Sequence, residues 1–126
     1  LRHPRDRVLS SWMQNFARNP AMACLTEIHT AGHLYDLCMS HFHLHFNDER
    51  LTLHKIKYED VIIDLRSSVE GLLEFIGIEW QENVTEFYNT AKNRVMINTP
   101  SYSQVIEPVH SDSLYRWEHY DDVVPQ

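Results

Sequence analysis

Apolar residues recur every three or four positions along most of the chain, a spacing that predicts amphipathic helices. The first run predicts a helix over residues 4–18, because Pro4 suits the first helical turn and Asn19-Pro20 ends the pattern. Its expected apolar face consists of Val8, Leu9, Trp12, Met13 and Phe16. The next run predicts a long helix over residues 21–46. Its expected buried positions are Leu25, Ile28, Leu34, Leu37, Cys38 and Phe42.

The middle of the chain departs from this helical period. Residues 51–58, LTLHKIKY, loosely alternate apolar and polar side chains, which predicts a strand that ends at Tyr58. Residues 95–109 contain two prolines and no sustained period, so we expect a long irregular segment there. Three more helices are expected, over residues 60–76 with Gly77 as a left-handed stop, over 81–92 and over 112–123.

Length and composition indicate one soluble domain, with 126 residues of which 43% are apolar. No stretch approaches the roughly 20 consecutive apolar residues of a membrane helix, so we expect a cytoplasmic protein. The 18 acidic residues outnumber the 11 lysines and arginines, which argues against non-specific binding to nucleic acid. Cys24 and Cys38 are the only cysteines, and they indicate neither a disulfide framework nor a thiolate zinc site.

Histidines are concentrated in the predicted helix over residues 21–46. His29 and His33 are four residues apart, which places two imidazoles on one helix face, as a metal site requires. His41, His43 and His45 follow near the end of the helix. No acid follows the first histidine in the HExxH manner, and the spacing fixes no third ligand. We therefore expect no physiological metal site.

Three arginines lie within the first seven residues of this acidic chain. An arginine that precedes a helix started by proline lies close to the unpaired N–H groups of the first turn, and this arrangement favours an anion. Arg2 would supply a planar fork of donors, and Ser10 a further hydroxyl donor on the same side. The alternative is that Arg2, Arg5 and Arg7 form a solvated cap that is paired with Asp6.

Three segments, taken in order, resemble a known family. The pattern Arg-x-Pro-Arg-Asp-x-x-x-Ser, from Arg2 to Ser10, resembles the 3′-phosphate-binding element of sulfotransferases that use 3′-phosphoadenosine 5′-phosphosulfate (PAPS). KYEDVIID, at residues 57–64, resembles the strand end that carries an adenine-contacting tyrosine. TPSYSQVIEPVHSDSLYRW, at residues 99–117, is similar to the C-terminal cofactor-binding segment of tyrosylprotein sulfotransferases and of bacterial relatives that are often fused to tetratricopeptide repeats.

The resemblance implies a set of cofactor-binding residues. Arg2 and Ser10 would bind the 3′-phosphate, Tyr58 the adenine, and Arg116 would lie near the phosphates. The loop that begins with Ser101, Tyr102, Ser103, Gln104 and Val105 and continues to His110 would lie over the nucleotide. Each role has a plain structural alternative: Tyr58 as a half-buried aromatic residue, Ser101 as a turn hydroxyl, and Arg116 as a surface cation paired with Asp112.

The sequence also departs from the family pattern. Gln14 stands where some relatives have another arginine for the phosphate. The three glycines, at positions 32, 71 and 77, cannot form the glycine-rich loop that wraps the 5′-phosphosulfate in the family. We therefore expect residues 1–126 to be the C-terminal part of a sulfotransferase domain, without the N-terminal 5′-phosphosulfate loop. We assign no catalytic residue, and we expect weak nucleotide binding and no turnover by this chain alone.

The fold and the partners follow from the same resemblance. The complete domain would be an α/β protein with the parallel sheet of P-loop nucleotide kinases, to which this mostly helical part contributes about one strand. PAPS, or its product 3′-phosphoadenosine 5′-phosphate (PAP), and a hydroxyl acceptor are the expected partners, and an exposed sheet edge or apolar helix face favours homo-oligomers. A eukaryotic tyrosylprotein relative would lie in the Golgi lumen. The rival prediction is a non-catalytic helical interaction module or a degenerate relative of the family.

Overall fold

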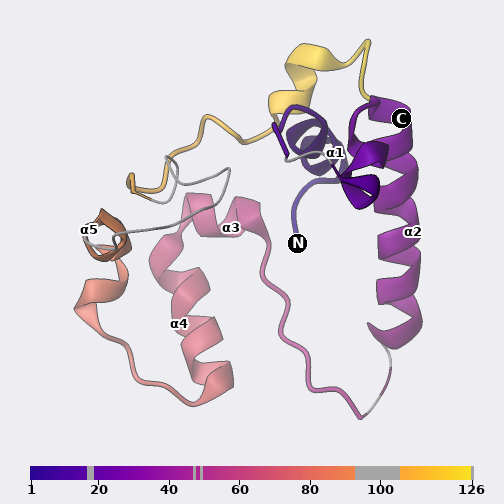
Figure 1. The fold of residues 1–126 in the computed structure, drawn as a ribbon. Helices are drawn as coiled ribbons and strands as arrows, with labels where there is room; N and C mark the ends of the chain where they lie inside the picture. The colour runs from indigo at the N-terminus through magenta and orange to yellow at the C-terminus, as the bar shows by residue number, and fades with distance from the viewer. Residues whose placement is uncertain (17–18, 47, 49, 93–105, 126) are drawn as a thin grey trace. The chain divides into compact units, whose positions relative to one another are not determined.

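The computed structural model describes residues 1–16, 19–46, 48, 50–92 and 106–125, and within these ranges it contains helices but no strand. The chain divides into two compact units, one of Leu1 with Ile56–Asp112 and the other of Arg2–Lys55 with Ser113–Gln126. Figure 1 shows the helices, which in chain order are α1 (Pro4–Trp12), η1 (Pro20–Leu25), α2 (Ile28–Phe46), α3 (Tyr58–Ile63), α4 (Leu65–Ile76), η2 (Glu82–Val84), α5 (Phe87–Lys92) and η3 (Arg116–Tyr120), where η marks a 3₁₀ helix. None of these helices has the length and apolarity that a membrane span requires.

The first helix begins where the sequence predicts but ends earlier. Pro4 occupies the first helical position, where its missing N–H costs no hydrogen bond. Past the end of α1 the Gln14 N–H donates to the carbonyl of Ser11 at 3.4 Å, a turn-like bond that does not continue the helix. The predicted extent of 4–18 is therefore wrong at its end, and the last two residues of that range lie outside the described residues. Met13, expected on the apolar face, is 43% exposed.

The helix predicted over residues 21–46 forms as two helices, η1 and α2. The Thr26 hydroxyl donates to the carbonyl of Ala23 at 2.7 Å, and the Thr30 hydroxyl donates to that of Cys24 at 2.6 Å. Such hydroxyl bonds compete with the backbone ladder of a continuous helix. The bend between η1 and α2 therefore lies where two threonines bond back to the preceding turn.

Two positions of α2 that were expected to be buried are exposed. Leu37 is 54% exposed, and Cys38 is also exposed. The reason is visible in Figure 1, where α1 lies beside the first part of α2 and the rest of α2 extends past it. Leu34 and Phe42 are half-buried. Both cysteines of the chain are thiols rather than disulfide-bonded residues.

One hydrophobic core is shared by α1, α2 and residues 113–125, the C-terminal segment. Its buried members are Val8 and Leu9 from α1, Ile28 and Ala31 from α2, and Val124 near the end of the chain. Partly buried side chains packed against them are Trp12, Leu25, Tyr35, Trp117 and Tyr120. Full burial of a side chain such as Val or Leu contributes about 1.5–3 kcal/mol. Val124 is thus part of the core that holds α1 in place.

The strand predicted over residues 51–58 is not present. Leu51 and Leu53 are 48% and 46% exposed, and the segment has no ladder partner in the described ranges. A strand is stable only when a neighbouring strand pairs with its N–H and C=O groups. Tyr58, expected at the end of the strand, is instead the first residue of α3.

One residue nevertheless pairs with this segment in the manner of a sheet. The Leu1 amino group donates to the carbonyl of Ile56, and the Tyr58 N–H donates to the carbonyl of Leu1 at 2.7 Å. In parallel strands, one residue donates to the residue before the one that it faces and accepts from the residue after it. Leu1 does this with Ile56 and Tyr58, on either side of Lys57. The first residue of the chain is thus aligned parallel to residues 56–58.

The helix predicted over residues 60–76 is divided at Asp64, whose backbone is not helical (φ −143°, ψ 86°). The Asp64 carboxylate accepts the Ser67 N–H at 3.0 Å and so caps α4. At the other end Gly77 has φ 74°, which confirms the predicted left-handed stop. The spacing of the apolar residues correctly predicts helix here, but it does not predict the break between α3 and α4 at Asp64.

The two remaining helical predictions are met in part. Residues 81–92 form η2 and α5, and Val84, Phe87 and Tyr88 are half-buried. The helix predicted over 112–123 is reduced to the five residues of η3, because Tyr115 just before it has a positive φ of 49°. Residues 95–105 of the predicted irregular segment lie outside the described residues, and 106–109 are irregular.

Loss of the α4 cap should destabilise the protein measurably. We expect Asp64→Ala to lower the free energy of unfolding by about 1 kcal/mol, since the Ser67 N–H loses its acceptor. Asp64→Asn should keep most of the stability, because an amide oxygen also caps. Urea unfolding and hydrogen exchange at the Ser67 amide measure the effect, with the exposed Glu79→Ala as control. Equal losses for Asp64→Ala and Glu79→Ala would contradict the assignment.

Candidate anion-binding site

Arg2 and Ser10 meet on one side of α1. The Nη1 of Arg2 donates to the Oγ of Ser10 at 3.1 Å, and its Nη2 donates to the carbonyl oxygen of Ser113 at 2.6 Å. Both bonds are partly buried. The oxygens of Ser10 and Ser113 are neutral acceptors, and these two bonds orient the guanidinium.

The hydroxyl of Ser10 can serve an anion at the same place. A serine hydroxyl has one O–H donor and two acceptor lone pairs. Ser10 uses an acceptor position for Arg2, and within the described part of the chain its own O–H has no acceptor. An anion at this point can accept the Ser10 O–H while the charge of Arg2 attracts it.

The position of the guanidinium differs in detail from the sequence-based expectation. Ser10 is the seventh of the nine residues of α1 and lies about 9 Å along the helix axis from Pro4. The guanidinium therefore lies alongside the helix, where Ser10 and Ser113 hold it, and not beside the N–H groups of the first turn. The pair itself, a planar cation beside a hydroxyl, is what the sequence pattern proposes for a phosphate.

A buried carboxylate connects α1 to the C-terminal segment. Asp6 is 1% exposed, and its Oδ1 accepts the backbone N–H of Trp117 at 3.0 Å. The Trp117 ring stacks on His3, with ring centroids 5.2 Å apart and an angle of 8° between the planes. Because Ser113 lies four residues before Trp117, the same segment that bonds to Asp6 also supplies the carbonyl that orients Arg2.

The arginine cluster is not a solvated cap on Asp6. Arg5 pairs with Asp121 at 2.7 Å, and its guanidinium carbon lies 4.5 Å from the centroid of the Trp117 ring. Such an arrangement adds a cation–π attraction to the ion pair. Arg7 is exposed. The structure thus gives different partners to Arg2 and Arg5, and it contradicts the alternative in which Asp6 pairs with them.

The other proposed cofactor residues lie elsewhere. Tyr58 is half-buried at the start of α3, in the unit that does not contain Arg2 and Ser10. Residues 101–105 lie outside the described ranges. Arg116 is half-buried at the start of η3 and forms no ion pair with the described residues. The Asp112 carboxylate lies instead beside His110, whose Nδ1 is 3.4 Å away.

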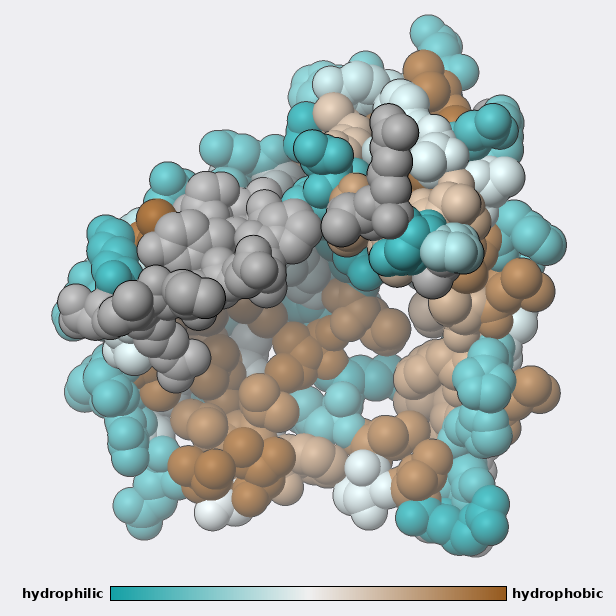
Figure 2. All heavy atoms as spheres, viewed as in Figure 1, coloured by the Kyte–Doolittle hydropathy of each residue, from teal (hydrophilic) through white to brown (hydrophobic). Residues whose placement is uncertain are grey.

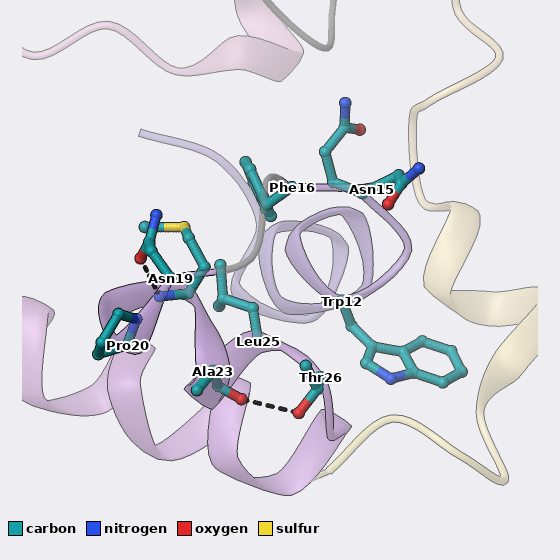
Figure 3. Close-up of a pocket in the computed structure, with 10 residues that line it drawn as sticks. Trp12, Asn15, Phe16, Asn19, Pro20, Ala23, Leu25 and Thr26 are labelled. Atoms are coloured by element: carbon teal, nitrogen blue, oxygen red, sulfur yellow. Dashed lines mark hydrogen bonds between the residues drawn. The ribbon is translucent and has the colours of Figure 1, made fainter.

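A cavity of about 760 Å³ lies between the end of α1 and η1. Trp12, Phe16, Leu25, Asn15 and Asn19 are among the residues that line it, and in Figure 3 the indole of Trp12 points away from Phe16 and Leu25. The Asn19 side chain accepts the Met22 N–H at 2.9 Å and so caps η1, whose residues line part of the cavity. A volume in the range of roughly 300–1,000 Å³ suits a small organic ligand.

Tyr35 is a titratable side chain of the same unit whose pKa departs from its ordinary value. Partial burial raises the pKa of the Tyr35 phenol, and the nearby positive charge of Arg7 opposes part of that rise. The neutral phenol is therefore the stable form, and we assign Tyr35 to the packing around the core rather than to proton transfer.

Sequence reasoning considered Asp6 only as a partner of the arginines, so it missed the bond of Asp6 to the Trp117 N–H, and it also missed the carbonyl of Ser113. One feature of the sequence could have indicated the role of Asp6, namely an acid in the first turn of a helix with an apolar face. The sequence contains no sign of the role of the Ser113 carbonyl, because a backbone carbonyl has no residue-type signal. Asp6 and Ser113 lie far apart in the chain, so only folding brings them to the same side of α1.

Comparison with known proteins agrees with the motif-based resemblance at the level of the sulfotransferase family. The model of the sulfotransferase family matches residues 1–82, which is more than half of the chain, and the chain belongs to this family. The chain is 25% identical over 124 residues to an uncharacterised protein of Aquifex aeolicus (strain VF5), in an alignment that covers 95% of this chain and 16% of that relative. The chain therefore spans about one sixth of that relative's length. No solved structure matches the chain significantly.

Removal of the Asp6 carboxylate should detach the C-terminal segment from α1. We expect Asp6→Ala to cost about 1–3 kcal/mol of stability, since it leaves the partly buried Trp117 N–H without its acceptor. Asp6→Asn should cost less, because the amide oxygen can still accept that N–H. Urea unfolding followed by tryptophan fluorescence measures the change, and Asp122→Ala, at an exposed acid near the end of the chain, is the control. A wild-type midpoint for Asp6→Ala would refute this role.

Proposed function

We propose that this chain is the part of a sulfotransferase domain that binds the 3′-phosphoadenosine moiety of PAPS for sulfonate transfer to a hydroxyl acceptor. One observation carries the proposal: the Arg2 guanidinium and the Ser10 hydroxyl are 3.1 Å apart in a chain of the sulfotransferase family. We further propose a relation to tyrosylprotein sulfotransferases and their bacterial relatives, from the similarity of residues 99–117. The parallel-type pairing of Leu1 supports a place in a parallel sheet.

The chemistry of the pair suits a phosphate group. A guanidinium presents N–H donors in a plane that matches two phosphate oxygens, and a hydroxyl adds a single directed donor. Ser113 and Ser10 already orient the guanidinium, so binding need not immobilise a free side chain. The proposed ligand of this pair is the 3′-phosphate of the nucleotide.

The proposed reaction is an in-line displacement at sulfur. The acceptor oxygen forms a bond to sulfur, the bond from sulfur to the bridging phosphate oxygen breaks, and PAP leaves with the electron pair of that bond. The proton of the acceptor hydroxyl must pass to a base. We assign no residue of this chain as that base, so its proposed contribution is to hold and position the donor.

Further contacts to the nucleotide are proposed from the family pattern. Tyr58 would contact the adenine, because a phenol ring offers both a stacking face and a hydroxyl. Residues 101–105 would cover the nucleotide, and Arg116 would add positive charge near its phosphates. The half-buried position of Arg116, with no ion pair in the described part of the chain, is compatible with such a role.

Calorimetry with PAP tests the phosphate assignment directly. Arg2→Ala should weaken binding about tenfold to a hundredfold, since a hydrogen bond to a charged group contributes about 1.5–3 kcal/mol. Ser10→Ala should weaken it about fivefold. Adenosine 5′-monophosphate lacks the 3′-phosphate, so its weaker binding should not respond to either change. Arg50→Ala is the matched control, because Arg50 is 88% exposed and pairs only with Asp48 among the described residues.

The outcomes separate the alternatives. Equal losses for both nucleotides would place Arg2 at another part of the ligand. Unchanged affinity for PAP in both Arg2→Ala and Ser10→Ala would remove the proposed function.

The adenine assignment predicts a difference between two substitutions at one position. Tyr58→Phe keeps the ring and should leave the affinity for PAP within about twofold. Tyr58→Ala removes the ring and should weaken binding by about tenfold, since stacking of a base on an aromatic side chain contributes about 1–3 kcal/mol. Inorganic phosphate has no base, so its binding should not change. Loss of phosphate binding in Tyr58→Ala would show a structural rather than an adenine-binding role.

A further inference from the structure

The second half of α2 carries two histidines whose rings are already side by side. His41 and His45 are four residues apart on this 19-residue helix, and both are exposed. Their ring centroids are 4.8 Å apart, with an angle of 69° between the ring planes. No such ring contact joins the equally spaced His29 and His33 in the described structure. The His41–His45 pair is therefore a specific local arrangement and not only a consequence of helical spacing.

The distance between the rings fits two ligands of one metal ion. An imidazole nitrogen binds zinc at about 2.0–2.1 Å. Two imidazoles on one ion, at angles between square and tetrahedral, then have ring centroids roughly 4.5–5.2 Å apart. The observed 4.8 Å lies inside this range. Imidazole is a preferred ligand of Zn²⁺, Cu²⁺ and Ni²⁺, which defines the class of metal.

One chain supplies only half of such a site. Within the described ranges no group of three or more His, Cys, Asp or Glu side chains could hold a metal ion. Zinc in structural sites is almost always bound by four protein ligands. Two copies related by a twofold axis would supply two histidines each, which makes four. The expectation of no metal site rested on the missing HExxH acid and on the lack of a third ligand fixed by spacing, and a second copy of the chain would supply further ligands.

The surroundings of the pair suit a second copy of the same helix. Leu37 and Leu44 lie within one turn of His41 on the same face of α2, and they are 54% and 77% exposed. Figure 2 shows hydrophobic side chains interspersed with hydrophilic ones over this helix. In an isologous pair of helices these leucines would pack beside the metal, because each helix would face the identical patch of its partner.

We propose that His41 and His45 form half of a site for zinc-class divalent metals, and that two copies of this chain complete the site as a metal-linked dimer. The experiment uses the untagged 126-residue chain, with Zn²⁺ as the probe. Sedimentation velocity should show a shift from one to two chain masses on addition of Zn²⁺, reversed by EDTA. Calorimetry should give one zinc ion per two chains for this event.

Single substitutions identify the ligands. His41→Ala and His45→Ala should each weaken the zinc-dependent dimer by more than about 100-fold, since loss even of a partner outside the ligand shell costs about 10–100-fold in affinity. His43→Ala is the matched control, because His43 is exposed on the opposite side of the helix. The Gln variants of His41 and His45 repeat the test with polar side chains, and far-UV circular dichroism verifies that each variant is helical.

A second readout does not depend on the mass. Co²⁺ in place of Zn²⁺ should give the intense visible absorption of a tetrahedral site in the wild type and in His43→Ala, and only weak absorption in the other variants. One zinc ion per chain without dimerisation would overturn the proposal. So would a dimer that persists in EDTA and is insensitive to His45→Ala, or equal losses for His43→Ala and His45→Ala.

Discussion

The hydrogen bond from the Trp117 N–H to the buried Asp6 carboxylate is the contact on which the candidate site depends. A helix of nine residues is marginal in water by itself, so α1 relies on tertiary contacts for its stability. The segment that makes this bond also places the Ser113 carbonyl against Arg2 at 2.6 Å. The position of the guanidinium therefore depends on residues more than a hundred positions away in the sequence.

Burial of a carboxylate is costly, and the surroundings of Asp6 show how that cost is offset. Oδ1 accepts the Trp117 N–H, whereas Oδ2 has no hydrogen-bond partner among the described residues. Asp6 also lies in the first turn of α1, where the helix dipole favours negative charge. An apolar residue would pack here without that cost, but it would give the C-terminal segment no directional bond. The carboxylate thus fixes the register of Trp117 against α1.

The sequence predicted those features that depend on local chemistry. Pro4 at the start of α1 and Gly77 at the end of α4 follow from backbone preferences of single residues, and both predictions are confirmed. The breaks at Thr26 and Asp64 were missed, because polar side chains that bond to the backbone can interrupt an apolar period without altering it. The predicted strand over residues 51–58 fails for a different reason. Alternating side chains are typical of a strand, but a strand forms only when a neighbouring strand pairs with its N–H and C=O groups. The local sequence does not show whether such a neighbour is present.

The site illustrates why local geometry can outweigh composition. The chain has a formal charge of −7, and a phosphate carries negative charge as well, so their long-range interaction is unfavourable. At physiological ionic strength the Debye length is about 8 Å, and acids farther away than this are largely screened. Within that radius the bonds from Arg2 to the oxygens of Ser10 and Ser113 fix the position of the guanidinium, and the hydroxyl of Ser10 adds a directed donor. An acidic protein can therefore hold an anion, provided that folding fixes a cation and a hydroxyl donor at one place.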